Sequence, residues 1–363
     1  MKAGFFSPLP PARTGVADYA AALIGAMRRT GDVEIGAQDA DVCLYHLGNN
    51  QLHRDIYRQA LARPGVAVLH DAVLHHFFLG TLDQAAYVEE FVYNYGAWSA
   101  DLARGLWRNR ARSAADPRYF EYPMLRRIAE TSRAVVVHNP GAAAMVRAHA
   151  PAARVFEVPH LYEEVPAPPA RPFPRPLFGV FGHLRESKRL FAVLKAFPAV
   201  RGASLLVAGE MGSQEFGRAL EPLLAQPGVI RRRFAPEPEF TRLLGSVDVG
   251  VNLRYPAAGE TSGITIRLMG LGRPVLVTRG AETSRFPEDA CVRIDAGPAE
   301  VEMLAEMMIW LASDAAARLE IGRRARAHIA SRHAPEIAAR LYWEVLGEVR
   351  ETTGQRCLVP GLR

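Results

Sequence analysis

The chain has 363 residues, of which 49% are hydrophobic and 23% are charged. This length exceeds one ordinary domain, and the composition is that of a globular protein with enough apolar material for two cores. The formal net charge is +6, but the densest basic run is only Arg231-Arg232-Arg233, which argues against a nucleic-acid-binding module. The basic surplus fits either arginine usage in a GC-biased genome or attraction to a polyanionic substrate or an anionic membrane surface.

Cysteine usage and hydropathy indicate the cellular compartment in which we expect the protein. Cys43, Cys291 and Cys357 lie far apart and show neither CxxC nor Cys/His metal spacing. The sequence contains no 18-residue apolar run, and its N-terminus lacks the apolar core of a signal peptide. We therefore expect a cytoplasmic protein, and the sequence leaves peripheral contact with a membrane open.

The first half of the chain alternates short apolar runs with amphipathic stretches. We expect strands at 2–6, 42–46, 66–70, 134–138 and 155–158, and helices at 16–29, 52–62, 87–107, 122–131 and 141–149. Such alternation predicts a parallel α/β sheet. Residues 1–165 are therefore assigned to an N-terminal Rossmann-like domain.

Prolines then interrupt the pattern at 159, 166, 168, 169, 172, 174 and 176, too densely for a helix or a central strand. We assign a linker to 166–176 and a second Rossmann-like domain to 177–333. Its expected strands are 177–181, 204–208, 229–232, 247–251, 275–278 and 291–294, and its expected helices are 188–197, 214–225, 237–244, 264–270, 299–312 and 315–331. A final helix at 334–351 is expected to pack back on the N-terminal domain.

Four motifs follow one another along these two halves. They are residues 7–19 (SPLPPARTGVADY), 69–71 (LHD), 182–189 (GHLRESKR) and 259–263 (GETSG). In this order and spacing the chain resembles retaining glycosyltransferases of the GT-B fold, family 4-like, over nearly its whole length. The resemblance implies two Rossmann-like parallel-sheet domains that face an interdomain cleft, and it implies transfer without a cofactor or metal ion.

The N-terminal motifs supply two candidate sites. Gly15 opens the first helix in the segment after the first strand, where a close backbone approach and the helix N-terminus favour a phosphate; the alternative is a plain strand-to-helix turn. His70 ends an apolar strand, and the resemblance implies that it contacts the transferred sugar; the alternative is a structural histidine. Asp71, His75 and His76 follow and are assigned to the acceptor side.

The motif at 182–189 places cations beside a helix start. The resemblance implies that Lys188 binds the donor diphosphate, with Arg189 beside it; the alternative is a solvated helix start. The family usually has an arginine five residues before the lysine, and here that position is His183. Further along, Glu210, Arg233 and Phe234 are assigned to the nucleobase and ribose region.

The loop at 259–263 combines an anion-binding helix start with a carboxylate. Its glycine-flanked amides at Thr261, Ser262 and Gly263 are expected to bind phosphate, and Glu260 is expected to act on the sugar. The family usually holds the nucleotide ribose with a second glutamate, where this chain has Arg267. Arginine only donates hydrogen bonds, so Arg267 either reaches the diphosphate, pairs with Glu260 two turns away, or donates to ribose oxygens.

These features predict a hexosyltransferase that moves a sugar from a nucleoside-diphosphate sugar to a glycan, lipid-linked or small-molecule acceptor. His70, Lys188 and Glu260 are the expected catalytic residues. Two alternatives stay open: a GT-B sugar phosphorylase or epimerase, and a nucleotide-sugar-binding protein without catalysis. The departures at His183 and Arg267 favour the second of them.

Overall fold

The computed structural model describes residues 1–12, 14–164, 173–233 and 235–356, the last five of these by their backbone alone. Phe234, Cys357 and most of the expected linker therefore lie outside the described residues. The chain forms two compact units. Unit 1 comprises Met1–Leu161, Ala258–Thr261 and the stretch from Ala334 onward, and unit 2 comprises Tyr162–Ala257 and Ser262–His333.

Unit 1 contains a six-stranded parallel sheet in the order β2-β1-β3-β4-β5-β6. The strands are β1 (Lys2–Phe6), β2 (Asp32–Ile35), β3 (Val42–Leu47), β4 (Val66–Leu69), β5 (Ala134–Val137) and β6 (Val155–Glu157). Alternate residues of β4 enter two different cores: Val66 and Val68 pack on one face, and Ala67 and Leu69 on the other. Burial on both faces explains why these strands are continuous apolar runs.

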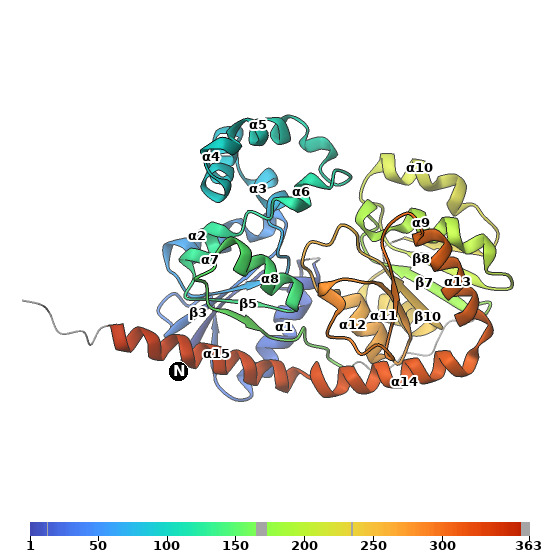
Figure 1. Cartoon of the computed structure of the whole chain (residues 1–363). Helices are drawn as coiled ribbons and strands as arrows, with labels where there is room; N and C mark the ends of the chain where they lie inside the picture. The colour runs from blue at the N-terminus through green and yellow to red at the C-terminus, as the bar shows by residue number, and fades with distance from the viewer. Residues whose placement is uncertain (13, 165–172, 234, 357–363) are drawn as a thin grey trace, which may run out of the picture. The chain divides into compact units, whose positions relative to one another are not determined.

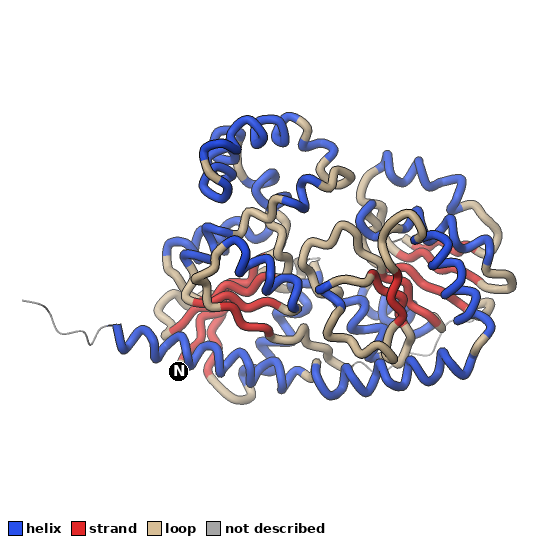
Figure 2. Tube along the Cα trace, in the orientation of Figure 1, coloured by secondary structure: helices blue, strands red, loops and turns tan. Residues whose placement is uncertain are grey.

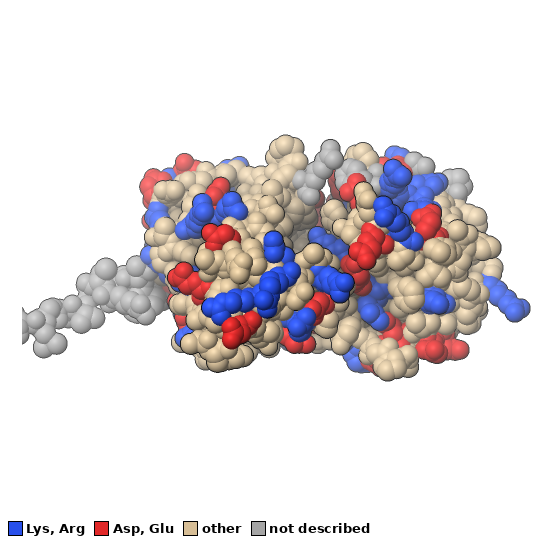
Figure 3. Space-filling model, turned by 90° about the horizontal axis from the view of Figure 1, so that it is seen from above, with Lys and Arg blue, Asp and Glu red and all other residues tan. Residues whose placement is uncertain are grey.

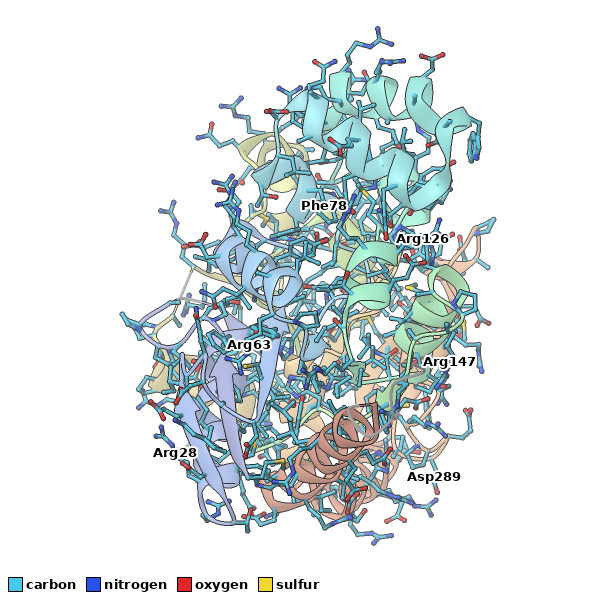
Figure 4. The ribbon with its side chains drawn as sticks, turned by 90° about the vertical axis from the view of Figure 1, so that its left-hand side faces the viewer. Arg28, Arg63, Phe78, Arg126, Arg147 and Asp289 are labelled. Carbon is cyan, nitrogen blue, oxygen red and sulfur yellow. The ribbon has the colours of Figure 1, made fainter. Side chains whose placement is uncertain are left out.

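Helices cover both faces of this sheet (Figure 1). One core includes residues of α1 (Gly15–Arg28) and α15 (Pro335–Arg356), and the other includes residues of α2 (Arg54–Ala62), α7 (Arg126–Thr131) and α8 (Pro140–His149). The second core continues into a lobe of short helices, α3 (His75–Thr81), α4 (Gln84–Tyr95), α5 (Ala100–Arg108) and α6 (Arg118–Glu121). Phe78 lies where this lobe joins the rest of unit 1, beneath the short helices (Figure 4).

Unit 2 contains a second six-stranded parallel sheet, in the order β12-β11-β10-β7-β8-β9. Its strands are β7 (Leu177–Phe181), β8 (Ser204–Ala208), β9 (Val229–Arg232), β10 (Val249–Asn252), β11 (Val275–Thr278) and β12 (Val292–Ile294). Residues of α9 (Leu190–Ala196), α10 (Gln214–Leu224) and α13 (Glu300–Ser313) form one of its cores, and residues of α11 (Glu237–Ser246), α12 (Gly263–Gly270) and α14 (Ala315–Arg332) form the other. Figure 2 shows each sheet between its helices.

Some local expectations from the sequence are wrong, and helices α3 and α6 were not expected. The single helix expected at 87–107 is two helices, because Gly96 adopts a φ of 91° that ends α4. Strand β2 was not expected, since only one of its four residues is buried and it carries no apolar run. Among the described residues, no helix combines the length and apolar character needed to cross a bilayer.

Candidate functional site

Unit 2 holds the expected anion-binding element at the start of α12. Ser262 caps the helix, and its hydroxyl accepts a hydrogen bond from the Thr265 N–H at 3.3 Å. The first N–H groups of a helix have no partner within the helix, and its dipole adds partial positive charge at this end. The backbone at Gly263 therefore favours a phosphate, as the sequence predicts.

Lys188 lies beside this helix start. Its Nζ donates to the Phe181 carbonyl at 2.7 Å, which places the ammonium at the end of β7. Gly182 lies between the two elements: a Cβ there would be 2.8 Å from Ile264 Cδ1 and 3.0 Å from Lys188 Nζ. Gly182 also has a φ of 92°, a backbone conformation that favours glycine. The lysine and the start of α12 thus form one cationic cradle.

The cradle occupies the switch point of the unit 2 sheet. Strands β7 and β10 are neighbours there, although they are far apart in sequence, and the order of the strands reverses. In open α/β sheets, ligands bind at the carboxyl edge of such a point. His183, Glu210 and Arg233 follow β7, β8 and β9 at the same edge and are exposed. Desolvation, followed by the nearby Arg185 and Lys188, lowers the pKa of His183 from its ordinary value.

Two arginines that the sequence assigns to the diphosphate have carboxylate partners. Arg189 pairs with Glu300, whose side chain is buried on α13. Arg267 pairs with Glu237 at 2.5 Å and donates to the Thr241 hydroxyl. Of the interpretations left open for Arg267, the one that pairs it with Glu260 is wrong, because the structure pairs it with a carboxylate of another helix. The partner is Glu237 on α11.

The loop at 259–263 is divided between the units. Ala258–Thr261 belongs to unit 1, and α12 begins just beyond it in unit 2. In unit 1, Asn139 at the cap of α8 donates to the Gly259 carbonyl and to the Thr261 hydroxyl, both at 2.9 Å. Glu260 Oε2 accepts from the Ala258 N–H at 2.7 Å. These bonds fix the shape of the segment that carries the expected catalytic carboxylate.

A row of buried histidines lies along the carboxyl edge of the unit 1 sheet. His46 is in β3, His70 follows β4 and His138 follows β5, so the three come from adjacent strands. His46 Nδ1 lies 3.0 Å from His70 Nε2, and His70 Nδ1 lies 3.3 Å from His138 Nε2. Tyr19 packs against all three rings and hydrogen-bonds through its hydroxyl to Tyr342 at 3.0 Å.

The carbonyl at one end of the row sets the tautomer of each ring. His138 Nδ1 must donate to the Val158 carbonyl, 2.9 Å away, so in the neutral ring Nε2 accepts from His70 Nδ1. His70 Nε2 then accepts from His46 Nδ1, and His46 Nε2 is left as a buried acceptor without a partner among the described residues. Burial lowers the pKa of all three histidines, that of His138 to about 4. Both nitrogens of His70 are thus occupied within unit 1.

The other predicted residues of unit 1 are also held by hydrogen bonds. Asp71 Oδ2 accepts from the Asn49 N–H, and His75 is fully buried between the Tyr122 carbonyl and the Tyr87 hydroxyl. Burial lowers the pKa of His75 to about 3. His76 bridges the Ser113 carbonyl and the Asn49 side chain. Gly15 is exposed at the start of α1, where a Cβ would meet nothing within 4 Å.

Sequence reasoning missed His46, His138 and Glu237 as partners of predicted site residues. The two histidines had a signal, because three expected strands (42–46, 66–70 and 134–138) each end on a histidine. Glu237 had none, since it lies 30 residues from Arg267. Among the described residues, no three His, Cys, Asp or Glu side chains are arranged to hold a metal ion. Both basic and acidic side chains lie on the face shown in Figure 3.

Solved structures share this architecture, whereas no family model matches the sequence and no curated protein matches it significantly. Anabaena HepE, in complex with UDP and glucose, matches with a TM-score of 0.67 and 12% identity over 96% of this chain and 100% of its own. The chain has the GT-B fold. Sucrose-phosphate synthase from Thermosynechococcus elongatus matches with a TM-score of 0.66 and 13% identity, covering 97% of this GT-B chain and 100% of its own. WaaG, a glycosyltransferase involved in lipopolysaccharide biosynthesis, matches with a TM-score of 0.56 and 14% identity, covering 94% of this chain and 99% of its own.

The GT-B fold confirms the fold class expected from the four motifs. Two parallel sheets with helices on both faces are what the alternation of strands and helices predicts. At 12–14% identity the likeness shows the fold, and the reaction must be argued from the residues of this chain.

Proposed function

We propose that this GT-B protein is a glycosyltransferase that moves a sugar from a nucleoside-diphosphate sugar to an acceptor hydroxyl. One observation carries the proposal: Lys188, Gly182 and the start of α12 converge at the switch point of the unit 2 sheet. A buried ammonium beside a helix N-terminus is suited to a diphosphate. HepE, with the same fold, is described in complex with UDP and with UDP-glucose, which supports this donor class.

The chemistry follows from the charge that the reaction develops. As the bond between the sugar and the diphosphate breaks, negative charge grows on the leaving oxygen, and Lys188 and the α12 amides stabilise it. The acceptor oxygen forms the new bond to the sugar, and its proton passes to the departing diphosphate. In this scheme the acceptor attacks from the leaving-group side, so configuration is retained and no metal ion is required. Glu260 accepts hydroxyl protons of the transferred sugar, the role that the resemblance implies.

A binding and turnover screen tests the proposal. Purified protein is titrated with UDP, ADP and GDP and with UDP-glucose, ADP-glucose and GDP-mannose, and slow release of free nucleoside diphosphate from the sugar nucleotide that binds is then measured. We expect binding of at least one nucleoside diphosphate and hydrolysis that depends on Lys188. Binding without any release identifies a non-catalytic binder, and release of sugar 1-phosphate in the presence of phosphate identifies a phosphorylase. Absence of binding by every nucleotide overturns the proposal.

Glu260 separates catalysis from nucleotide binding. Glu260→Gln keeps the size of the side chain but removes its charge, so we expect turnover to fall about a hundredfold, the usual effect of losing one group that acts in the transition state. The affinity for free nucleoside diphosphate should stay within about twofold, since this residue is assigned to the sugar. Glu164→Gln, in an exposed ion pair with Arg326, is the control. Unchanged turnover in Glu260→Gln contradicts the assigned role.

A further inference from the structure

The pair formed by Arg267 and Glu237 belongs to a small cluster on neighbouring helices of unit 2. Arg267 extends from α12 and bonds to Oε1 of Glu237, the first residue of α11. Thr241, one turn along α11, donates to the same oxygen at 2.9 Å. The guanidinium carbon of Arg267 lies 5.3 Å from the centre of the Phe240 ring. Arg267 is therefore held by three contacts, and the Glu237 carboxylate accepts hydrogen bonds from Arg267 and Thr241.

This cluster adjoins the diphosphate cradle. The Phe240 ring packs edge-on against the ring of Phe181, with centroids 5.9 Å apart, and the Phe181 carbonyl is the partner of Lys188. Arg267 lies four residues after Gly263 on α12, so the two share a face about 6 Å apart along the helix axis. A nucleoside diphosphate whose phosphates occupy the helix start extends its ribose over a comparable length.

The chemistry of the cluster suits a ribose. The 2′- and 3′-hydroxyls of ribose are donors that a carboxylate accepts, as in other nucleotide-binding α/β folds. Arg267 has only donors, whereas Glu237 has two oxygens that together accept about four hydrogen bonds. Both bonds from Arg267 and Thr241 use Oε1, and the Glu237 side chain is 58% exposed. The carboxylate thus keeps acceptor capacity toward solvent at the carboxyl edge of the sheet.

We propose that Glu237 binds the ribose hydroxyls of the donor nucleotide and that Arg267 positions it. This inference rests on the proposed function, because it assigns a subsite of the same donor. It moves the ribose carboxylate from position 267 of α12, where the resemblance predicts it, to the adjoining first turn of α11. The arginine at 267 then orients a carboxylate on the neighbouring helix instead of replacing one.

The test compares nucleotides that differ only in the ribose. UDP, 2′-deoxy-UDP and 3′-deoxy-UDP are titrated by calorimetry, with the matching ADP or GDP series where one of these binds better. We expect the wild type to bind the ribonucleotide about tenfold more tightly than a deoxy form, the usual worth of a hydrogen bond to a charged group. Glu237→Gln should bring the ratio to within about twofold, while affinity for the deoxy forms stays unchanged.

Matched variants separate this role from a structural one. Glu239→Gln alters a second carboxylate of α11, which pairs with Arg242, and should keep the full ratio. Arg267→Lys retains a cation beside Glu237 and should keep part of the ratio, whereas Arg267→Met should lose most of it. An unchanged ratio in Glu237→Gln overturns the inference while nucleotide binding itself stands. Absence of nucleoside diphosphate binding in the wild type overturns the proposed function and the inference together.

Discussion

The carboxyl edges of the two sheets differ sharply in chemistry. In unit 1 the edge carries a closed row of neutral histidines, whose rings bond to one another and pack against Tyr19. In unit 2 the edge carries an ammonium, a helix start and exposed polar side chains at His183, Glu210 and Arg233. Both sheets are parallel and six-stranded, but the strand order reverses between β1 and β3 in one and between β7 and β10 in the other.

This difference leads us to expect different effects when residues at the two edges are changed. In unit 2 the edge carries the start of a helix, whose first N–H groups have no partner within the helix, and we propose that this edge binds a diphosphate. Unit 1 satisfies nearly all the nitrogens of its histidine row internally, so that edge is fixed before any ligand arrives. Changes in unit 1 should therefore appear in stability and its pH dependence, and changes in the unit 2 cradle should appear in nucleotide affinity.

Acidification should produce the largest effect, and it should act through unit 1. Burial lowers the pKa of His53 and of His138 to about 4, from an ordinary value of 6.5. The unfolded chain takes up these protons below pH 6.5, whereas the folded chain takes them up only near pH 4, so stability is full above pH 6.5 and falls as the pH drops toward 4. The loss is up to roughly 3 kcal/mol for each of these two groups.

Denaturant unfolding at pH 7, 6 and 5 measures this loss. His53→Gln stays neutral and keeps a donor for the His46 carbonyl, so its free energy of unfolding should decline less steeply than that of the wild type. Equal free energies of unfolding at pH 7 and pH 5 in the wild type would show that His53 and His138 are not neutral and buried as described.

Loss of Lys188 should affect the other edge. Lys188→Ala removes the ammonium from the cradle, so affinity for nucleoside diphosphate should fall about a hundredfold, because a charge-assisted contact to phosphate is lost. Lys195→Ala, at an exposed position of α9, is the matched control and should bind as the wild type does. Calorimetric titration gives the affinities, and thermal unfolding checks that both variants fold. Equal nucleoside diphosphate affinities of Lys188→Ala and Lys195→Ala would contradict the role of Lys188 and the proposed difference between the two edges.

The hydroxyl pair of Tyr19 and Tyr342 should give the smallest effect. Tyr342→Phe leaves the buried Tyr19 hydroxyl without this partner, so the free energy of unfolding should fall by about 1–2 kcal/mol at pH 7. Replacing both tyrosines with phenylalanine should cost less than the sum of the two single changes, since no hydroxyl is then stranded. Tyr93→Phe, whose hydroxyl is exposed, should change stability by less than about 0.5 kcal/mol. If the loss in the double variant equals the sum of the two single losses, the two hydroxyls do not interact as described.

The sequence predicts the layers of this fold well because buried parallel strands consist of consecutive apolar residues. The strand at 66–70 is an example, since its neighbours on both sides and both helical faces demand apolar residues. The edge strand β2 escaped prediction for the opposite reason, because three of its four residues face solvent. Gly96 interrupts a helical pattern that periodicity alone treats as continuous.

Within the candidate site, the sequence predicts which backbone positions suit an anion, but not which side chains pair with each other. Gly182 and the start of α12 could be anticipated from glycine placement and helix capping. The engagement of Arg189 by Glu300 spans 111 residues and depends on how α13 packs, which no local pattern encodes. The division of the loop at Thr261 likewise depends on long-range bonds from Asn139.

Helix α15 determines when unit 1 can complete its folding. Its residues come after those of unit 2, yet Tyr342 and Leu346 are fully buried in a unit 1 core, and the Trp343 ring packs against Gly31. During synthesis on the ribosome, the face of the unit 1 sheet that α1 and α15 share therefore lacks α15 until unit 2 has been translated. The unit whose chain is made first is completed last, and a fragment cut at Leu161 lacks the helix that closes its core.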